Sequence, residues 1–398
     1  MKVLHLFDLY LPHTMNWAYR MIRAMPDAEH WAAAPWIVRN EYFSRDIRFF
    51  IRPLQRMTGW LPESEWRGEW FAARLVRSEH YCPANRNWLL RRLKNARPDV
   101  LHAHFAPVGF HYLDLAKKLD IPLVVSFYGY DYESLPFRKH VWQERYRRLF
   151  HEAKVVTCAG EHGREVLIGQ GCPAQKINVL PMSMQPGEFP FCEREKQPGK
   201  LRLVQVATIT EKKGYMDTLD AFNIALKRCP GMHLTIAGER YNPQLVSRMQ
   251  QFIKTNDLEQ HVTWLDFMPH GALPQLFSTA DVFIHPSHYT ETRDCEGGPV
   301  SILEAQATGL PVISTNHFDI PSEVLHSVTG LLAPERDPAM LAQHIERFYS
   351  MQHDEYQQFS HHARRHVEQN FDVKNTAQKL HTIYAEIVHN SSFIVHRS

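Results

Sequence analysis

Short runs of hydrophobic residues alternate with longer segments of helical periodicity along most of the chain. In the first half, runs rich in Val, Ile and Leu cover residues 2–7, 100–105, 123–128, 155–159 and 178–182. Such runs are typical of strands buried on both faces of a parallel sheet. Helical patterns cover residues 17–25, 111–119, 138–151 and 161–169, and the segment 39–97, rich in Arg and Trp, is predicted to be mostly helical.

The second half repeats the same alternation. Strands are predicted at residues 202–207, 233–237, 262–266, 282–285 and 312–314, with helices that include 216–227 and 244–255. Residues 354–389 read as two helices that are broken near Phe371. The segment 185–200 is rich in Pro and Gly and has no periodicity, which predicts a linker between domains. The pattern as a whole predicts an α/β protein with two doubly wound domains.

Composition and charge narrow the class of protein. Hydrophobic residues make up 44% and charged residues 22%, which is ordinary for a folded domain. The net charge of +2 does not favour nucleic acid as a partner. No apolar stretch approaches the length of a membrane span, and Asp8 interrupts the first apolar run too early for a signal peptide. With six scattered cysteines, these features predict a cytoplasmic protein with reduced thiols.

Arginine and histidine side chains are two further candidates for binding lipid, phosphate or metal. Arginines recur between residues 45 and 92, and they either coat solvated helix faces or meet anionic lipid or a phosphorylated acceptor. Both readings stay open. His102 and His104 lie on a predicted strand, and we expect them to face opposite sides and therefore not to form a metal site together. No metal site is predicted.

The most informative segment follows the strand at residues 282–285. A polar loop leads to Glu296, Gly297 and Gly298, and a helix is expected to start near Pro299. The glycines let the backbone approach a ligand, and the free N–H groups of a helix start suit an anion. Glu296 and Glu304 are carboxylates of the kind that accept hydrogen bonds from sugar hydroxyls. An ordinary strand–loop–helix unit with surface glutamates is the alternative.

The chain resembles a known enzyme family at several of these positions. The Glu296-to-Glu304 spacing, the run 304–313 and the segment 330–334 are similar to retaining family 4 glycosyltransferases with the GT-B fold. Residues 211–214 and 234–238 match two further second-domain segments of that family. Residues 102–105 and 125–131 look like first-domain segments of members that build bacterial exopolysaccharide, including the colanic acid type.

The resemblance implies an architecture and a set of roles. Two Rossmann-like domains, residues 1–188 for the acceptor and 189–375 for the donor, would face a central cleft, and a helix within 376–398 would return to the first domain. Lys213 would bind the donor diphosphate, Glu304 the ribose, and Glu296 the transferred sugar. Glu296, Tyr128 and Lys213 are the candidate catalytic residues. Gly238 would border the base. Sugar and phosphate would also meet the backbone of Gly297, Gly298, Pro299 and Val300.

This sequence departs from the family pattern at three places. Thr208 stands where an Arg usually contacts phosphate, and it is placed among the donor-binding residues. Tyr128 stands where many members have a His that contacts the donor sugar; a Tyr can hydrogen-bond but is no base near pH 7. The first loop is not Gly-rich, and Thr14 takes its place. Thr14, His104 and Asp131 are the candidate acceptor-binding residues, although Asp131 could instead cap a helix.

The resulting hypothesis is a retaining hexosyltransferase that uses a UDP- or GDP-linked sugar and no other cofactor. Since the sequence contains no Asp-x-Asp motif, the reaction is expected to be independent of a metal. The implied acceptor is a saccharide on a lipid diphosphate at the inner membrane face, with peripheral contact to anionic lipid. Two alternatives stay open. A sugar-nucleotide epimerase or hydrolase of the same fold would change the donor without an acceptor, and a catalytically silent partner protein would bind no nucleoside diphosphate.

Overall fold

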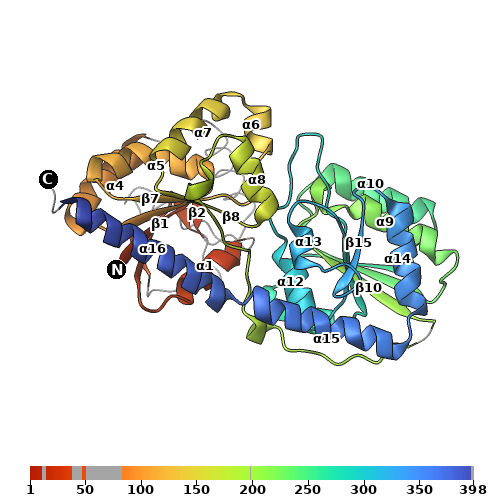
Figure 1. The fold of residues 1–398 in the computed structure, drawn as a ribbon. Coiled ribbons are helices and arrows are strands. Elements are labelled where there is room, and N and C mark those ends of the chain that lie inside the picture. Colours follow the sequence, from red (N-terminus) through yellow and green to blue (C-terminus); the bar gives the residue numbers. More distant parts are fainter. Residues whose placement is uncertain (11–14, 38–46, 51–82, 198, 396–398) are drawn as a thin grey trace. The chain divides into compact units, whose positions relative to one another are not determined.

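The computed structural model describes residues 1–10, 15–37, 47–50, 83–197 and 199–395 (Figure 1). The chain forms two compact units. Met1–Pro181 and Val373–Ser398 make up the first unit, and Met182–Asp372 make up the second. Each unit is a parallel sheet with helices on its faces (Figure 1), so the predicted α/β class is confirmed. Thr14 and most of the segment 39–97 lie outside the described residues.

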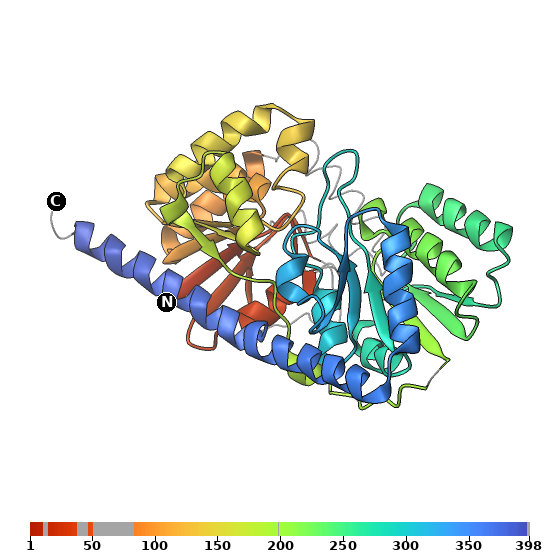
Figure 2. The ribbon, with the colours of Figure 1, turned by 45° about the vertical axis from the view of Figure 1, so that its right-hand side comes forward.

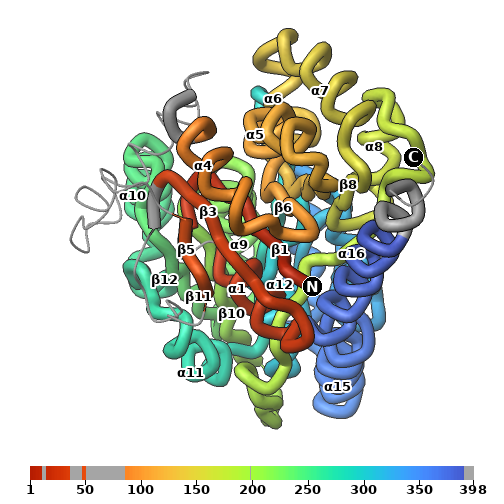
Figure 3. The backbone as a smooth tube through the Cα atoms, turned by 90° about the vertical axis from the view of Figure 1, so that its left-hand side faces the viewer, coloured from red at the N-terminus to blue at the C-terminus, as the bar shows by residue number. Residues whose placement is uncertain are grey.

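The first unit contains a parallel sheet in the order β5-β3-β1-β6-β7-β8-β9. Figure 3 shows β5, β3, β1 and β6 following one another across it. Its strands are β1 (Lys2–Leu6), β3 (Glu29–Ala33), β5 (Arg48–Phe50), β6 (Val100–His104), β7 (Leu123–Ser126), β8 (Val155–Cys158) and β9 (Ile177–Val179), and β2 (Leu9–Tyr10) pairs with β4 (Trp36–Ile37). The helices are α1 (Asn16–Arg23), α4 (Pro83–Ala96), α5 (Ala106–Leu119), α6 (Ser134–Arg138), α7 (Val141–Glu152), α8 (Glu161–Gly169) and α16 (Val373–Val395).

Helix α16 belongs to the first unit although the second unit precedes it in the chain. Its residues Ala377, Leu380 and Tyr384 are buried in one cluster with Val3 and Val100 of the sheet. Apolar residues two positions apart along a strand lie on one face of the sheet, and a helix must pack on that face to bury them. The structure therefore divides the chain after residues 181 and 372, earlier than the boundaries at 188 and 375 predicted from the sequence.

The second unit contains a sheet in the order β12-β11-β10-β13-β14-β15, again with parallel pairing throughout (Figure 2). The strands are β10 (Leu201–Val206), β11 (Met232–Ala237), β12 (Val262–Leu265), β13 (Val282–His285), β14 (Val312–Thr315) and β15 (Gly330–Ala333). The helices are α9 (Tyr215–Leu226), α10 (Pro243–Thr255), α11 (Leu273–Ser278), α12 (Val300–Ala307), α13 (Ile320–Glu323), α14 (Pro338–Ser350) and α15 (His353–Asn370). The strand order reverses between β10 and β13, where such sheets bind their ligands.

The segment predicted as a linker is packed onto the second unit, so that prediction was wrong. Phe189 is fully buried, and Arg194 is only 3% exposed. The Arg194 guanidinium donates to the carbonyl oxygens of Cys192, Phe277, Ala280 and Thr308. Because Phe277, Ala280 and Thr308 are far away in the sequence, a Pro-rich segment without periodicity gave no sign of its anchored position.

Within the described part of the chain, no helix combines the length and the hydropathy that crossing a membrane requires.

The anchoring role of Arg194 can be measured. Replacing it in Arg194→Leu removes the guanidinium from four carbonyl oxygens, of which those of Phe277 and Thr308 keep a backbone amide donor, and should lower the free energy of unfolding by about 3 kcal/mol. Urea denaturation followed by circular dichroism gives the value. Arg228→Leu is the matched control, because its side chain is 74% exposed and should change stability by less than about 0.5 kcal/mol. Equal losses in the two variants would contradict the prediction.

Candidate functional site

The loops at the carboxyl edge of the second sheet are in direct contact. The 3₁₀ turn Glu211–Lys213 follows β10 and ends at Gly214, whose φ is 65°. A Cβ at Gly214 would lie 1.9 Å from the carbonyl oxygen of Pro286, in the loop after β13. The amide of His288 also donates to the carbonyl of Lys212 at 3.1 Å. Only a glycine permits this approach, which sets Lys213 beside the loop that leads to Glu296.

Glu296 is the centre of this edge. It is 7% exposed, and its Oε2 lies 2.6 Å from the Nζ of Lys213. Its Oε1 lies 3.2 Å from the Nζ of Lys212, which also contacts Asp294. Burial alone would raise the pKa of Glu296, but the charges of Lys212 and Lys213 outweigh burial and lower it well below its usual range. The carboxylate is therefore ionised at any physiological pH, and it keeps the ammonium groups of Lys212 and Lys213 close to each other.

A histidine and a second glutamate hold the loop that carries Glu296. The backbone amide of Glu296 donates to Nε2 of His317 at 3.0 Å. Nδ1 of His317 therefore carries the proton and donates to Oε1 of Glu335 at 2.7 Å. Glu335 also accepts the amide of Tyr289. His317 and Glu335 were not predicted from the sequence, although they come shortly after strands β14 and β15, at the same sheet edge as Glu296.

The helix predicted near Pro299 begins at Val300, with Pro299 as its N-cap. Glu304 lies in its second turn, is 5% exposed and contacts Nε2 of His270 at 2.8 Å. His270 was not predicted from the sequence. The structure thus places Glu296 before the start of α12 and Glu304 within it, and gives each carboxylate a basic partner.

Two glycines permit close packing of the backbone along this edge. A Cβ at Gly298, where φ is 138°, would lie 2.8 Å from Oε1 of Glu323. A Cβ at Gly238 would lie 1.8 Å from the carbonyl oxygen of Ala207. Thr208 follows β10 and is half-buried, while Gly297 and Pro299 are buried and Val300 is half-buried. The predicted donor-binding residues therefore come from the carboxyl ends of adjoining strands and from the start of α12.

The predicted first-unit residues lie in and after β6 and β7. Asp131 is fully buried, and its carboxylate accepts the amides of Ala106, Tyr128 and Gly129. Burial raises its pKa to about 6 against the opposing effect of these hydrogen bonds. Asp131 thus supports the loop after β7 and the start of α5, which corresponds to the structural alternative. Its binding of an acceptor stays a prediction, as does that of Thr14.

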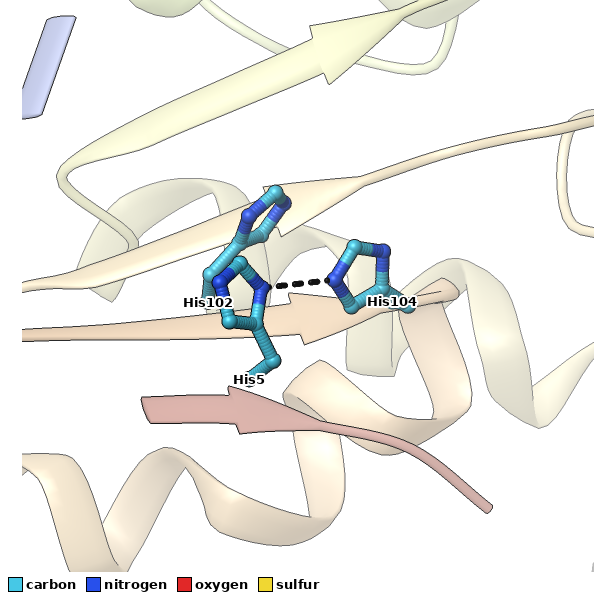
Figure 4. Close-up of side chains that lie close together, drawn as sticks. All are labelled: His5, His102 and His104. Carbon is cyan, nitrogen blue, oxygen red and sulfur yellow. Dashed lines mark hydrogen bonds between the residues drawn. The ribbon is translucent and has the colours of Figure 1, made fainter. Parts of the chain in front are cut away.

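The expectation that His102 and His104 face opposite sides is wrong. Side chains alternate with a period of two along a strand, so residues two positions apart share a face. Their ring centroids lie 4.2 Å apart, and His5 of β1 joins them (Figure 4). His104 also forms a 2.7 Å hydrogen bond through Nδ1 with the hydroxyl of Tyr128.

Comparisons with known proteins agree with this geometry. A family model described as "Glycosyl transferases group 1" matches residues 191–366, and one described as "Glycosyltransferase Family 4" matches residues 62–184. The amylovoran biosynthesis glycosyltransferase AmsK of Erwinia amylovora is 34% identical over 61% of this chain and 60% of its own. The putative colanic acid biosynthesis glycosyltransferase WcaL of Escherichia coli K12 is 30% identical over 77% of this chain and 75% of its own.

Solved structures show the same fold. Anabaena Alr3699/HepE in complex with UDP and glucose has a TM-score of 0.73 at 17% identity and covers 97% of this chain and 100% of its own. A glycosyltransferase from Rickettsia africae has a TM-score of 0.74 at 16% identity, with 98% and 99% coverage. The two Rossmann-like units define a protein of the GT-B class. The chain belongs to the family 4 glycosyltransferases.

The contact at Gly214 yields a prediction. In Gly214→Ala the new methyl group meets the Pro286 carbonyl, so the turn with Lys213 must move and binding of UDP should weaken about tenfold or more. Calorimetry measures the affinity, and thermal unfolding shows that the variant is folded. Gly169→Ala is the control, because no atom lies within 4 Å of its added Cβ. Unchanged affinity in Gly214→Ala would show that the turn does not position Lys213 for the nucleotide.

Proposed function

We propose that this protein transfers a hexose from a nucleoside diphosphate donor to a saccharide acceptor in the assembly of an exopolysaccharide. The main support is that Lys212 and Lys213 both form ion pairs with Glu296, close to the start of α12. The names of its relatives support the pathway, since AmsK and WcaL are described as amylovoran and colanic acid biosynthesis glycosyltransferases. The Anabaena structures with UDP and with UDP-glucose support a nucleotide sugar as donor.

The ion pairs suggest how the donor enters. The diphosphate carries the same charge sign as Glu296 and competes with it for Lys213. Lys213 and the free amides at the start of α12 then meet the phosphate oxygens, and the released carboxylate of Glu296 accepts hydroxyls of the sugar. Glu304 holds the ribose, and Gly238, whose backbone packs closely against Ala207, borders the base. In the proposal, the Glu296 carboxylate thus neutralises Lys213 until the donor diphosphate binds and replaces it.

The chemical step is proposed to retain the anomeric configuration and to require no metal. Lys213 and the helix amides stabilise the charge that grows on the leaving diphosphate. The leaving phosphate oxygen takes the proton of the attacking hydroxyl. Lys212 and Lys213 hold the pKa of Glu296 well below its usual range before the donor binds, so the carboxylate enters the reaction ionised, and its proposed part is to orient and stabilise the sugar. The acceptor is proposed to be a saccharide on a lipid diphosphate, presented at the cytoplasmic face of the membrane.

A screen of nucleotide sugars tests the donor. Thermal unfolding in the presence of UDP- and GDP-linked hexoses should show stabilisation by at least one of them, because a ligand that binds only the folded state raises the melting temperature. Incubation of that donor without an acceptor should leave its sugar unchanged. Conversion of the donor alone would point to an epimerase or hydrolase, and no stabilisation by any nucleoside diphosphate would point to a silent partner.

Substitutions of Glu296 and Lys213 distinguish the proposed contact with the sugar from the proposed contact with the diphosphate. Glu296→Gln should lower kcat about a hundredfold, while UDP binds as tightly as before or tighter, because Lys212 and Lys213 lose their counter-charge. Lys213→Met should instead weaken UDP binding and reduce its dependence on salt. Calorimetry and initial rates give both quantities. Arg228→Met is the control, since its partner is Glu346 of α14, outside the turn and the loop that form these ion pairs. A Glu296→Gln enzyme with full turnover would remove this carboxylate from the mechanism.

A further inference from the structure

A chain of hydrogen bonds begins in the loop after β7 and crosses the three adjacent strands β6, β1 and β3 of the first unit. The Tyr128 hydroxyl bonds Nδ1 of His104 at 2.7 Å, and Nε2 of His104 bonds Nδ1 of His5 at 3.1 Å (Figure 4). Nε2 of His5 bonds Nδ1 of His30 at 3.0 Å, and Nε2 of His30 bonds the carbonyl of Met25 at 3.1 Å. The chain runs from the loop after β7 through β6 and β1 to β3.

The carbonyl at the end of this chain fixes the direction of every bond. A carbonyl oxygen only accepts, so His30 carries its proton on Nε2 and offers a bare Nδ1. His5 must then donate from Nε2 and accept at Nδ1, and His104 must do the same. Nδ1 of His104 is left to accept the proton of Tyr128. This assignment requires neutral imidazoles. Burial lowers the pKa of both His5 and His104, and neighbouring histidines lower it further, so both rings are expected to be neutral.

We propose that His104, His5 and His30 are positioning residues that hold the Tyr128 proton inward, so that Tyr128 Oη meets its ligand only as a hydrogen-bond acceptor. The ligand group must then be a donor, and a sugar hydroxyl is the donor that glycosyl transfer provides. Tyr128 is partly exposed, and Trp17 packs against its ring with centroids 4.4 Å apart. The inference rests on the proposed function for the identity of this ligand, and on the first unit alone for the direction of the bonds.

A metal ion would need the same ring nitrogens. One nitrogen from each of His5, His102 and His104 lies within 4.8 Å of the others. Both nitrogens of His102 are, however, bonded to the hydroxyls of Tyr384 and Ser126, and those of His5 and His104 are in the chain. A metal would have to break these bonds and reverse the chain, so the hydrogen-bonded arrangement is the one that the geometry favours.

The chain also has a definite response to acid. One proton added to Nδ1 of His30 makes it a donor, which reverses His5 and His104 in turn and directs the Tyr128 proton outward. The groups that face His30 are His5, His381 and the N-terminal amino group, and His102 faces His5 and His104. Burial lowers the pKa of His30, so this reversal is expected below the ordinary titration range of histidine.

The direct test is the tautomer of each histidine in the full-length protein. Two-bond ¹⁵N–¹H correlation spectra at pH 7.5 should show His5, His30 and His104 protonated at Nε2. A proton on Nδ1 of His104 would overturn the inference, as would a shift of these signals on addition of one equivalent of Zn²⁺. This measurement needs no substrate, so it stands whether or not the proposed glycosyl transfer is correct.

The functional test breaks the chain at His5, which does not contact Tyr128. With the donor found by the screen, His5→Phe should lower kcat/KM about tenfold and flatten its fall at acid pH, while UDP binding is unchanged. His5→Gln, which keeps one donor and one acceptor, should recover most of the loss. His102→Phe is the matched control, equally buried on the same face but outside the chain, and should keep the wild-type pH profile. Equal kcat/KM in His5→Phe and wild type, or no rescue by Gln, would overturn the role of the chain.

Discussion

A buried carboxylate stays ionised only where opposite charge surrounds it, and Glu296 meets this condition through two lysines from a different loop. Much of the second unit serves that arrangement. Parallel strands bring the loops after β10 and β13 to one edge, the glycine at position 214 lets them touch, and His317 with Glu335 holds the amide of Glu296. The same edge carries the start of α12, so the two lysines lie near a helix N-terminus, and this is where the proposal puts the donor diphosphate.

The pattern of apolar runs predicted most of this fold. Strand β13 and helix α8 match the predicted residues throughout, because buried runs and helical periodicity are local signals. Glu296, Glu304 and Lys213 could be chosen because they sit in a recognisable string of residues. His317, Glu335 and His270 could not, since each gains its role from a partner on another strand or helix. Register and long-range pairing decide such contacts, and one sequence does not display them.

The errors have physical causes too. The segment 185–200 looked like a linker because its stabilising contacts are long-range hydrogen bonds to the Arg194 side chain rather than periodic apolar residues. The prediction that the histidines of β6 face opposite sides contradicts the two-residue period of a strand. It concealed a polar row on one face of the sheet, formed by His5, His102 and His104, in which His102 bonds Tyr384 of α16. That row is unusual for a sheet centre, where Val and Ile prevail. Its polar atoms are accommodated because hydroxyls and imidazoles bond one another across neighbouring strands.

The position of α16 in the first unit has a consequence for biosynthesis. A ribosome makes residues 182–372 before it makes α16, so the second unit has all of its strands while one face of the first sheet still lacks its cover. During that interval Val3, Val100 and Val124 lack their contacts with α16, and His102 lacks the hydroxyl of Tyr384. The unit that is begun first is therefore completed second, and a nascent chain of this protein exposes an apolar sheet face to chaperones until α16 has emerged.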